Sequence, residues 1–98
     1  TVIHYINDTI GDMDSGDEYN FEAHAKHWSE MKGFALSFQF NPRSPVSDEV
    51  FAQVHTLFGT APALPSDDNF DDYRTGLLEA RALLGAAYEF DTADVETW

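Results

Sequence analysis

The chain has 98 residues, and its 18 Asp and Glu against 5 Lys and Arg give a formal net charge of −13 at pH 7. This charge excludes nucleic acid as a partner and disfavours anionic membrane surfaces, because both are bound through Lys and Arg. It favours cations or basic partners, or it simply keeps the chain soluble. The absence of cysteine excludes disulfides, thiolate metal sites and cysteine nucleophiles. The length predicts a single domain over residues 1–98, and no apolar run approaches the roughly 20 residues of a transmembrane segment.

The first segment has apolar residues at helical spacing, namely Val2, Ile3, Ile6 and Ile10. We therefore expect a helix from Val2 to Ile10 that Gly11 ends. The chain starts directly on this apolar pattern and without Met, so we expect it to be a fragment of a longer protein.

The next segment, Asp12–Asn20, is acidic with a central Gly and predicts a loop. Asp12, Asp14 and Asp17 alternate as oxygen ligands do in a calcium loop, but the twelfth position counted from Asp12 is Ala23 instead of Glu. We therefore interpret the segment as a solvated loop whose charge complements the N-terminus of the following helix.

The central stretch, Phe21–Phe40, predicts a helix that Asn41-Pro42 ends, with a connector from Asn41 to Val46. At 100° per residue one stripe of this helix forms the core-facing side: His24, Trp28, Met31, Ala35 and Phe38. His27 lies at the edge of that stripe and Glu30 just beyond it.

Two further long helices follow. Ser47 is a good N-cap for a helix through Phe58, which Gly59 ends. After a loop with two prolines, either Asp67 or Asn69 is expected to cap the last long helix, which runs from Phe70 to Tyr88 or Phe90.

A final turn, capped by Asp91, is expected to extend through Trp98. These segments together predict an all-α fold, an up-and-down bundle of about four helices with short connections. No segment keeps the period-two alternation of a strand.

The candidate chemistry lies on the central helix. His27 and Glu30 are three residues apart, so they share one face and can present an imidazole and a carboxylate to one divalent metal ion. His24 is three residues before His27 and is a weaker candidate ligand. Two ligands do not complete a site, and the sequence leaves open which residues would add to them: His4, His55, Asp12 or Asp14.

A structural interpretation competes with the metal site. His27 can be a histidine at the edge of the core, and Glu30 can pair with Arg74 or Arg81 of the last long helix, because a buried carboxylate needs a partner. We favour this pairing over metal binding, and metal binding over general acid–base catalysis. The sequence contains no HEXXH, no GxSxG, no P-loop and no Rossmann glycine pattern.

A family resemblance covers most of the chain, roughly Val2 to Trp98. The segment AKHWSEMKGFALSFQFNPRSP, the later LLEARALLGAAYEF and the terminal TW resemble the C-terminal part of an uncharacterised family of bacterial envelope proteins, usually lipoproteins, that is similar to imelysin. His27 and Glu30 match the imelysin signature Gly-x-His-x-x-Glu, with Ala25 in place of the Gly.

The resemblance implies an all-helical fragment of a larger protein in the periplasm or outer membrane, with a role in iron uptake as one possibility. We therefore expect a non-catalytic helical domain of a cell-envelope protein, with metal binding at His27 and Glu30 or a role in iron uptake as options that stay open. The alternatives are a fragment of an imelysin-type metallopeptidase and a purely structural or interaction domain. We also expect a homo-oligomer that forms through apolar surface.

Overall fold

The computed structural model describes residues 1–37 and 46–98. Over these residues the chain is helical and contains no strand, which confirms the predicted all-α fold. The elements are α1 (Val2–Met13), the 3₁₀ turn η1 (Gly16–Glu18), α2 (Phe21–Leu36), α3 (Asp48–Phe58), α4 (Phe70–Ala87) and α5 (Thr92–Thr97).

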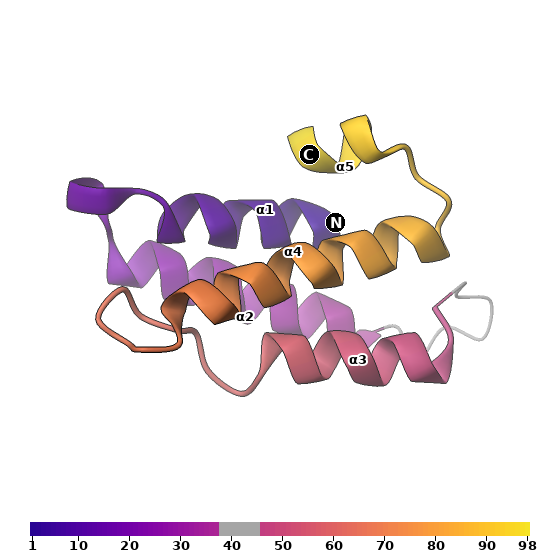
Figure 1. The fold of residues 1–98 in the computed structure, drawn as a ribbon, viewed down its shortest axis with the longest axis horizontal. Helices are drawn as coiled ribbons and strands as arrows, with labels where there is room; N and C mark the ends of the chain where they lie inside the picture. Colours follow the sequence, from indigo (N-terminus) through magenta and orange to yellow (C-terminus); the bar gives the residue numbers. More distant parts are fainter. Residues whose placement is uncertain (38–45) are drawn as a thin grey trace.

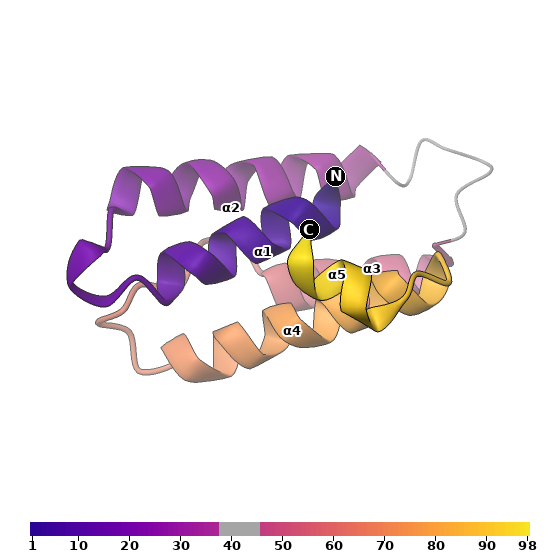
Figure 2. The same cartoon turned by 90° about the horizontal axis from the view of Figure 1, so that it is seen from above.

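The four long helices form an up-and-down bundle in which each helix runs opposite to the one before it (Figures 1 and 2). Helix α1 packs on α2 and α4, α3 packs on α4, and a smaller contact between α2 and α3 closes the ring. The short α5 packs on α1 and α4, so the two ends of the chain lie side by side (Figures 1 and 2).

Apolar residues from all four long helices meet in one core. Ile6, Met31, Val54, Phe58 and Leu77 are completely buried in it. Each comes from the face that the apolar spacing of its helix predicts, because an amphipathic helix buries its apolar stripe. Among the described residues no helix is both long and apolar enough to cross a membrane.

The predicted core stripe of α2 is largely confirmed. His24, Met31 and Ala35 are buried, and Trp28 is half-buried against the core, whereas Phe38 lies outside the described residues.

One polar link crosses this core. The indole Nε1 of Trp28 donates to the hydroxyl of Tyr73 at 2.6 Å, and that hydroxyl donates to the carbonyl of Phe58 at 2.7 Å. The link joins α2, α4 and the last residue of α3, and it provides partners for polar atoms that would otherwise be buried without them.

Helix α1 is longer than predicted, because Gly11 does not end it. The helix continues to Met13, whose side chain is buried in the core, and the amide of Asp14 still donates to the carbonyl of Ile10 at 2.9 Å. Burial of a large apolar side chain outweighs the cost of about 1 kcal/mol for a glycine inside a helix. Only Asp14–Asn20 of the predicted loop remains outside the helix, and it contains η1.

Helix α2 begins as predicted at Phe21, where the Asn20 side chain accepts a hydrogen bond from the amide of Ala23 at 3.1 Å. The helix is observed as far as Leu36. The predicted continuation to Phe40, the stop at Asn41-Pro42 and most of the connector lie outside the described residues.

The capping of α3 is confirmed. The Ser47 hydroxyl accepts from the amide of Val50 at 3.2 Å, and Gly59 follows the helix with φ of 69°. The predicted N-cap position of α4 is confirmed for Asn69, but no side chain among the described residues caps the helix. The Asp67 carboxylate instead accepts from the amide of Leu64 at 2.9 Å within the loop.

Candidate functional site

His27 faces two carboxylates from the neighbouring helix. Its Nδ1 donates to the carboxylate of Asp12 at 2.5 Å, and its Nε2 lies 3.9 Å from the carboxylate of Asp8. Asp8 and Asp12 are four residues apart, so α1 presents both of them on the face that packs against α2. The pairing of His27 with Asp12 is a charge-assisted hydrogen bond between two partly exposed side chains.

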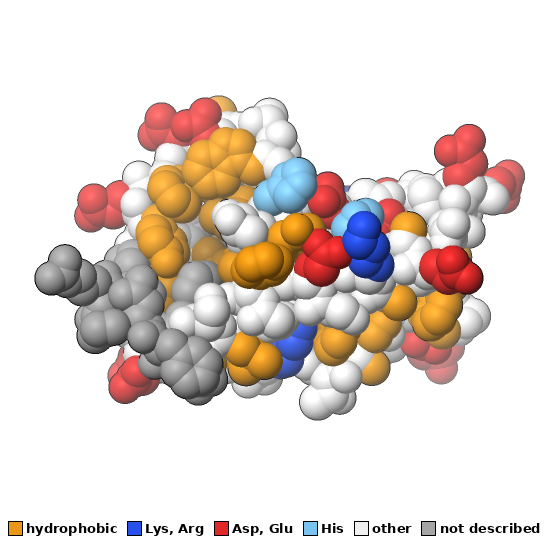
Figure 3. Space-filling model, turned by 180° about the vertical axis from the view of Figure 1, so that it is seen from behind, with side chains coloured by type: hydrophobic (Ala, Val, Ile, Leu, Met, Phe, Trp, Pro, Cys, Tyr) orange, Lys and Arg blue, Asp and Glu red, His pale blue; other side chains and the backbone are white. Residues whose placement is uncertain are grey.

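A second histidine, His4, contacts the same group of side chains. The Nε2 of His4 lies 3.2 Å from the same carboxylate oxygen of Asp8, so Asp8 lies between two imidazoles. Figure 3 shows histidine and acidic side chains next to one another on this face of the molecule, beside a group of hydrophobic ones. We call His4, Asp8, Asp12 and His27 the histidine seam.

The seam bears directly on the predicted metal site. His4 and Asp12 were two of the candidate partners of His27, whereas Asp8 was missed. Its signal in the sequence is the spacing of His4, Asp8 and Asp12 at four-residue intervals, one helical turn each. In the part of the chain that the structure describes, no three side chains of His, Asp or Glu are spaced to hold a metal ion.

Glu30 has partners other than the predicted arginines, so the predicted pairing with Arg74 or Arg81 is wrong. The Nζ of Lys26 lies 3.9 Å from the Glu30 carboxylate, one turn earlier on the same helix. A hydrogen bond to the Glu30 carboxylate, with burial adding to its effect, raises the pKa of the Tyr5 hydroxyl. Glu30 therefore lies at the edge of the bundle, and its partners are Lys26 and Tyr5 instead of an arginine from α4.

The two arginines bind elsewhere. Arg74 forms a two-pronged ion pair with Asp14, with N–O distances of 2.8 and 2.7 Å. Arg81 donates from Nη1 to the side-chain oxygen of Asn7 at 2.9 Å. Asp12 and Asp14, read from the sequence as members of a solvated acidic loop, are thus engaged by side chains from other helices.

His24 is a core histidine. It is completely buried, its Nδ1 lies 2.6 Å from the Tyr19 hydroxyl, and its Nε2 has no partner among the described residues. Burial lowers the pKa of His24 and favours the neutral ring. His55 lies on α3 with its ring 4.4 Å from that of Phe51, and burial lowers its pKa as well.

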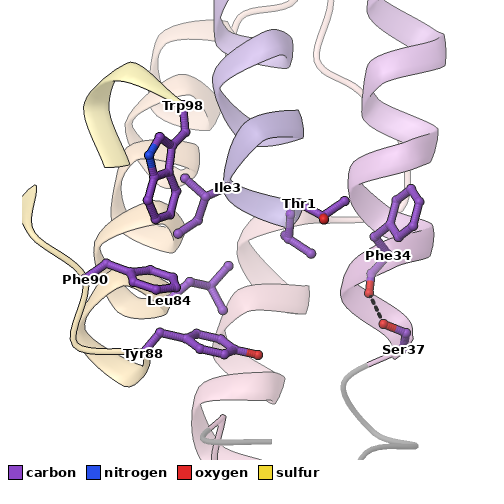
Figure 4. Close-up of a pocket in the computed structure, with 9 residues that line it drawn as sticks. Thr1, Ile3, Phe34, Ser37, Leu84, Tyr88, Phe90 and Trp98 are labelled. Carbon is purple, nitrogen blue, oxygen red and sulfur yellow. Dashed lines mark hydrogen bonds between the residues drawn. The ribbon is translucent and has the colours of Figure 1, made fainter. Parts of the chain in front are cut away.

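A separate feature, which sequence reasoning missed, is a pocket of about 330 Å³ where α1 begins and where α2 and α4 end. Figure 4 shows Trp98, Phe90 and Tyr88 on one side of it and Phe34 on the other, with the start of α1 between them. Ile3 and Leu84, both buried, form part of its lining. We call this feature the aromatic pocket.

The rings on one side of the aromatic pocket are packed against each other. Tyr88 and Phe90 stack with centroids 5.3 Å apart and planes 5° from parallel. Trp98 meets Phe90 edge-on, at 4.8 Å and 73°. Phe34, Phe90 and Trp98 are each more than 40% exposed, although an aromatic ring of this size usually buries most of its surface.

The backbone explains how these rings come together. Helix α4 ends in a Schellman motif: the amide of Phe90 donates to the carbonyl of Gly85 at 2.9 Å and that of Glu89 to the carbonyl of Ala86 at 3.2 Å. Glu89 takes the left-handed conformation with φ of 59°, at a position where glycine is usual, so no glycine marks this turn in the sequence. The turn brings Phe90 back onto Tyr88.

Trp98 is held by α1. The side-chain amide of Asn7 donates to the carbonyls of Val95 and Trp98, at 2.7 and 2.8 Å. Arg81 donates a hydrogen bond to the side-chain oxygen of Asn7, so Asn7 links α1, α4 and α5. The long-range nature of these contacts is the reason why the sequence pattern did not reveal the aromatic pocket.

Comparison with family models, with curated proteins and with solved structures finds no match to this chain. The resemblance to imelysin-like envelope proteins therefore stays a prediction.

Proposed function

We propose that this chain is a non-catalytic binding domain of a bacterial cell-envelope protein, and that its binding site is the aromatic pocket. The cell-envelope location follows from the resemblance alone. The binding role rests on the pocket: about 330 Å³ of concave space beside three half-exposed aromatic rings. Ligand sites in proteins have volumes of about 300–1,000 Å³, mostly apolar walls and a few polar groups.

The lining supports an apolar ligand. Ile3 and Leu84 offer aliphatic surface, and Phe90 and Trp98 offer ring faces at nearly a right angle to each other. The hydroxyl of Ser37 at the margin already donates to the carbonyl of Phe34 at 2.5 Å. Binding therefore gains its free energy mainly from removing apolar surface from water.

The test uses N-phenyl-1-naphthylamine, a neutral dye that fluoresces in apolar surroundings. We expect saturable binding to one site, with about tenfold weaker affinity in Trp98→Ala and in Phe90→Ala, since loss of one aromatic wall removes on the order of 1.4 kcal/mol. Phe21→Ala is the matched control, because Phe21 is an exposed phenylalanine that does not line the pocket. Absence of saturable binding, or binding that survives both pocket variants, would refute the proposal.

Metal binding is the second candidate function, and the position of Asp8 favours it. One carboxylate oxygen of Asp8 lies 3.2 Å from the Nε2 of His4 and 3.9 Å from the Nε2 of His27. Imidazole nitrogen and carboxylate oxygen are ligands of zinc and similar ions. An ion at the histidine seam would require these three groups to move closer together than they are.

Calorimetric titration with Zn²⁺ tests this second function. If the histidine seam binds the ion, His27→Ala and Asp8→Asn lose binding, and Glu30→Gln retains it because Glu30 contacts Lys26 and Tyr5. If Glu30→Gln loses binding and Asp8→Asn does not, the site is the His27–Glu30 pair predicted from the sequence. Absence of Zn²⁺ binding to the unaltered chain would eliminate both versions.

A further inference from the structure

The charges around the aromatic pocket indicate what kind of apolar molecule it takes. Glu89 and Asp91 flank Phe90 along the chain, and both are exposed. The whole chain carries a formal net charge of −13. A pocket in such a molecule attracts cations and repels anions, because the summed field of the protein acts on any charged ligand that approaches.

The positive side chains of the described residues lie elsewhere. None of them lines the aromatic pocket. Arg74 binds Asp14, Arg81 binds Asn7, Lys26 lies near Glu30, and Lys32 lies 3.4 Å from the carbonyl of His55. An anionic ligand would therefore find no positive side chain in the lining that the structure describes, where the cationic group is the terminal amino group of Thr1.

The rings themselves favour a cation. The face of an aromatic ring carries partial negative charge, so a cation within about 6 Å of the ring centre is attracted to it, most strongly by Trp. Phe90 and Trp98 meet at 73° and form a corner with aromatic surface on two sides. Quaternary ammonium groups suit such corners because they are weakly hydrated and large enough to touch more than one ring.

We propose that the ligand of the aromatic pocket is an organic cation, a quaternary ammonium group joined to an apolar body. This inference rests on the proposed function and specifies its ligand class. The apolar body contacts Ile3 and Leu84, and the cationic head lies against Phe90 and Trp98. Glu89 and Asp91 do not line the pocket, but they precede and follow Phe90 in the chain and add exposed negative charge there.

Three small molecules of similar shape and different charge test the inference. They are benzyltrimethylammonium, the neutral 2,2-dimethyl-3-phenylpropan-1-ol and the anionic phenylmethanesulfonate. Binding is followed by NMR on the indole N–H signals of the full 98-residue chain, which contains two tryptophans. Trp98 lines the pocket and Trp28 is bonded to Tyr73 inside the bundle, so we expect only the Trp98 signal to move.

We expect the cation to bind at least threefold more tightly than the neutral molecule and at least tenfold more tightly than the anion. Its advantage should shrink as NaCl is raised from 0.02 to 0.5 M, because salt screens exposed charges. Equal or tighter binding of the neutral molecule overturns the inference and leaves the proposed function intact. If none of the three moves the Trp98 signal, the pocket does not bind and both fail.

A charge variant gives an independent check. The double change Glu89→Gln with Asp91→Asn should weaken binding of benzyltrimethylammonium about twofold or more and leave the neutral molecule unaffected. Asp17→Asn with Glu18→Gln removes the same charge from η1, which lies at the other end of the bundle (Figure 1). If the η1 variant weakens cation binding as much as the pocket variant, the local carboxylates play no part and the assignment of the cationic head is wrong.

Discussion

Tyr73 is the residue through which three helices share a hydrogen bond. Its hydroxyl accepts from Trp28 at 2.6 Å and donates to the carbonyl of Phe58 at 2.7 Å. We expect Tyr73→Phe to lower the free energy of unfolding by about 1 kcal/mol, because the Trp28 indole and the Phe58 carbonyl each lose a short hydrogen bond and keep only the longer one between them, at 3.3 Å. Urea denaturation measures this loss. Thr56→Ala, which removes an exposed hydroxyl bonded only within α3, should cost less than about 0.5 kcal/mol.

The same residue makes stability depend on alkaline pH. Burial raises the pKa of Tyr73 to about 12, whereas the unfolded chain titrates near 10. Because the pKa is higher in the folded state, the stabilisation that the protonated Tyr73 hydroxyl contributes is complete below pH 10 and is lost as pH rises toward 12. The difference in unfolding free energy between the unaltered chain and Tyr73→Phe should therefore shrink over this range. A constant difference from pH 9 to 12 would show that the hydroxyl is accessible to solvent.

His24 makes stability depend on acidic pH in the opposite sense. Burial lowers its pKa, so on acidification the unfolded state takes up the proton first, near pH 6.5, and folding is destabilised as pH falls below that value. NMR titration should show that His24 and His55 stay neutral at pH values where an imidazole in the unfolded chain has become charged. Titration of His24 at or above pH 6.5 would contradict its placement in the core.

At the scale of residues, the sequence predicted burial better than it predicted partners. The helical stripe identified His24 as a core residue, because angular position on a helix decides burial. The sequence placed Asp12 among four candidate partners of His27 but could not choose between them, because that contact depends on how α1 and α2 align. The same limit explains the wrong assignment of Glu30 to an arginine.

At the scale of elements, the left-handed Glu89 allows a direct test of how α4 ends. A non-glycine residue in this conformation costs roughly 1–2 kcal/mol, and its amide and that of Phe90 both donate to α4. We therefore expect Glu89→Gly to raise the free energy of unfolding by about 1 kcal/mol. The matched change Glu79→Gly, at an exposed position inside α4, should lower it by a similar amount. If both changes destabilise equally, Glu89 does not have this conformation.

Helix starts were more predictable than helix ends. The caps at Asn20 and Ser47 depend on local side chains that accept a hydrogen bond from the amide three residues ahead, and such signals are visible in sequence. The end of α1 at Met13 depends on burial against the bundle, which overrides Gly11. The end of α4 depends on a Schellman turn formed without glycine.

At the scale of the whole molecule, a formal net charge of −13 on 98 residues opposes the compact state through self-repulsion. We expect NaCl to stabilise the fold, with Tm rising between 0.01 and 0.5 M by about 4–8 °C, the equivalent of about 1 kcal/mol for a domain of this size. Differential scanning calorimetry measures the effect. A fall in Tm would mean that exposed ion pairs such as Arg74–Asp14 contribute more than the repulsion.

The all-α bundle followed from helical periodicity, because each predicted stripe found its complement in a neighbouring helix. The aromatic pocket did not follow, because it combines residues from both ends of the chain. Self-association through apolar surface stays a prediction. Exposed rings at the pocket favour it, the shared negative charge opposes it, and sedimentation at low and high salt would decide.

The central claim is that the aromatic pocket binds a ligand at Trp98, and the most direct measurement is the NMR titration with benzyltrimethylammonium. We predict saturable movement of the Trp98 indole signal, no movement of the Trp28 signal, and loss of the effect in Phe90→Ala. An unmoved Trp98 signal in the presence of this cation, its neutral counterpart and its anionic counterpart would contradict the claim.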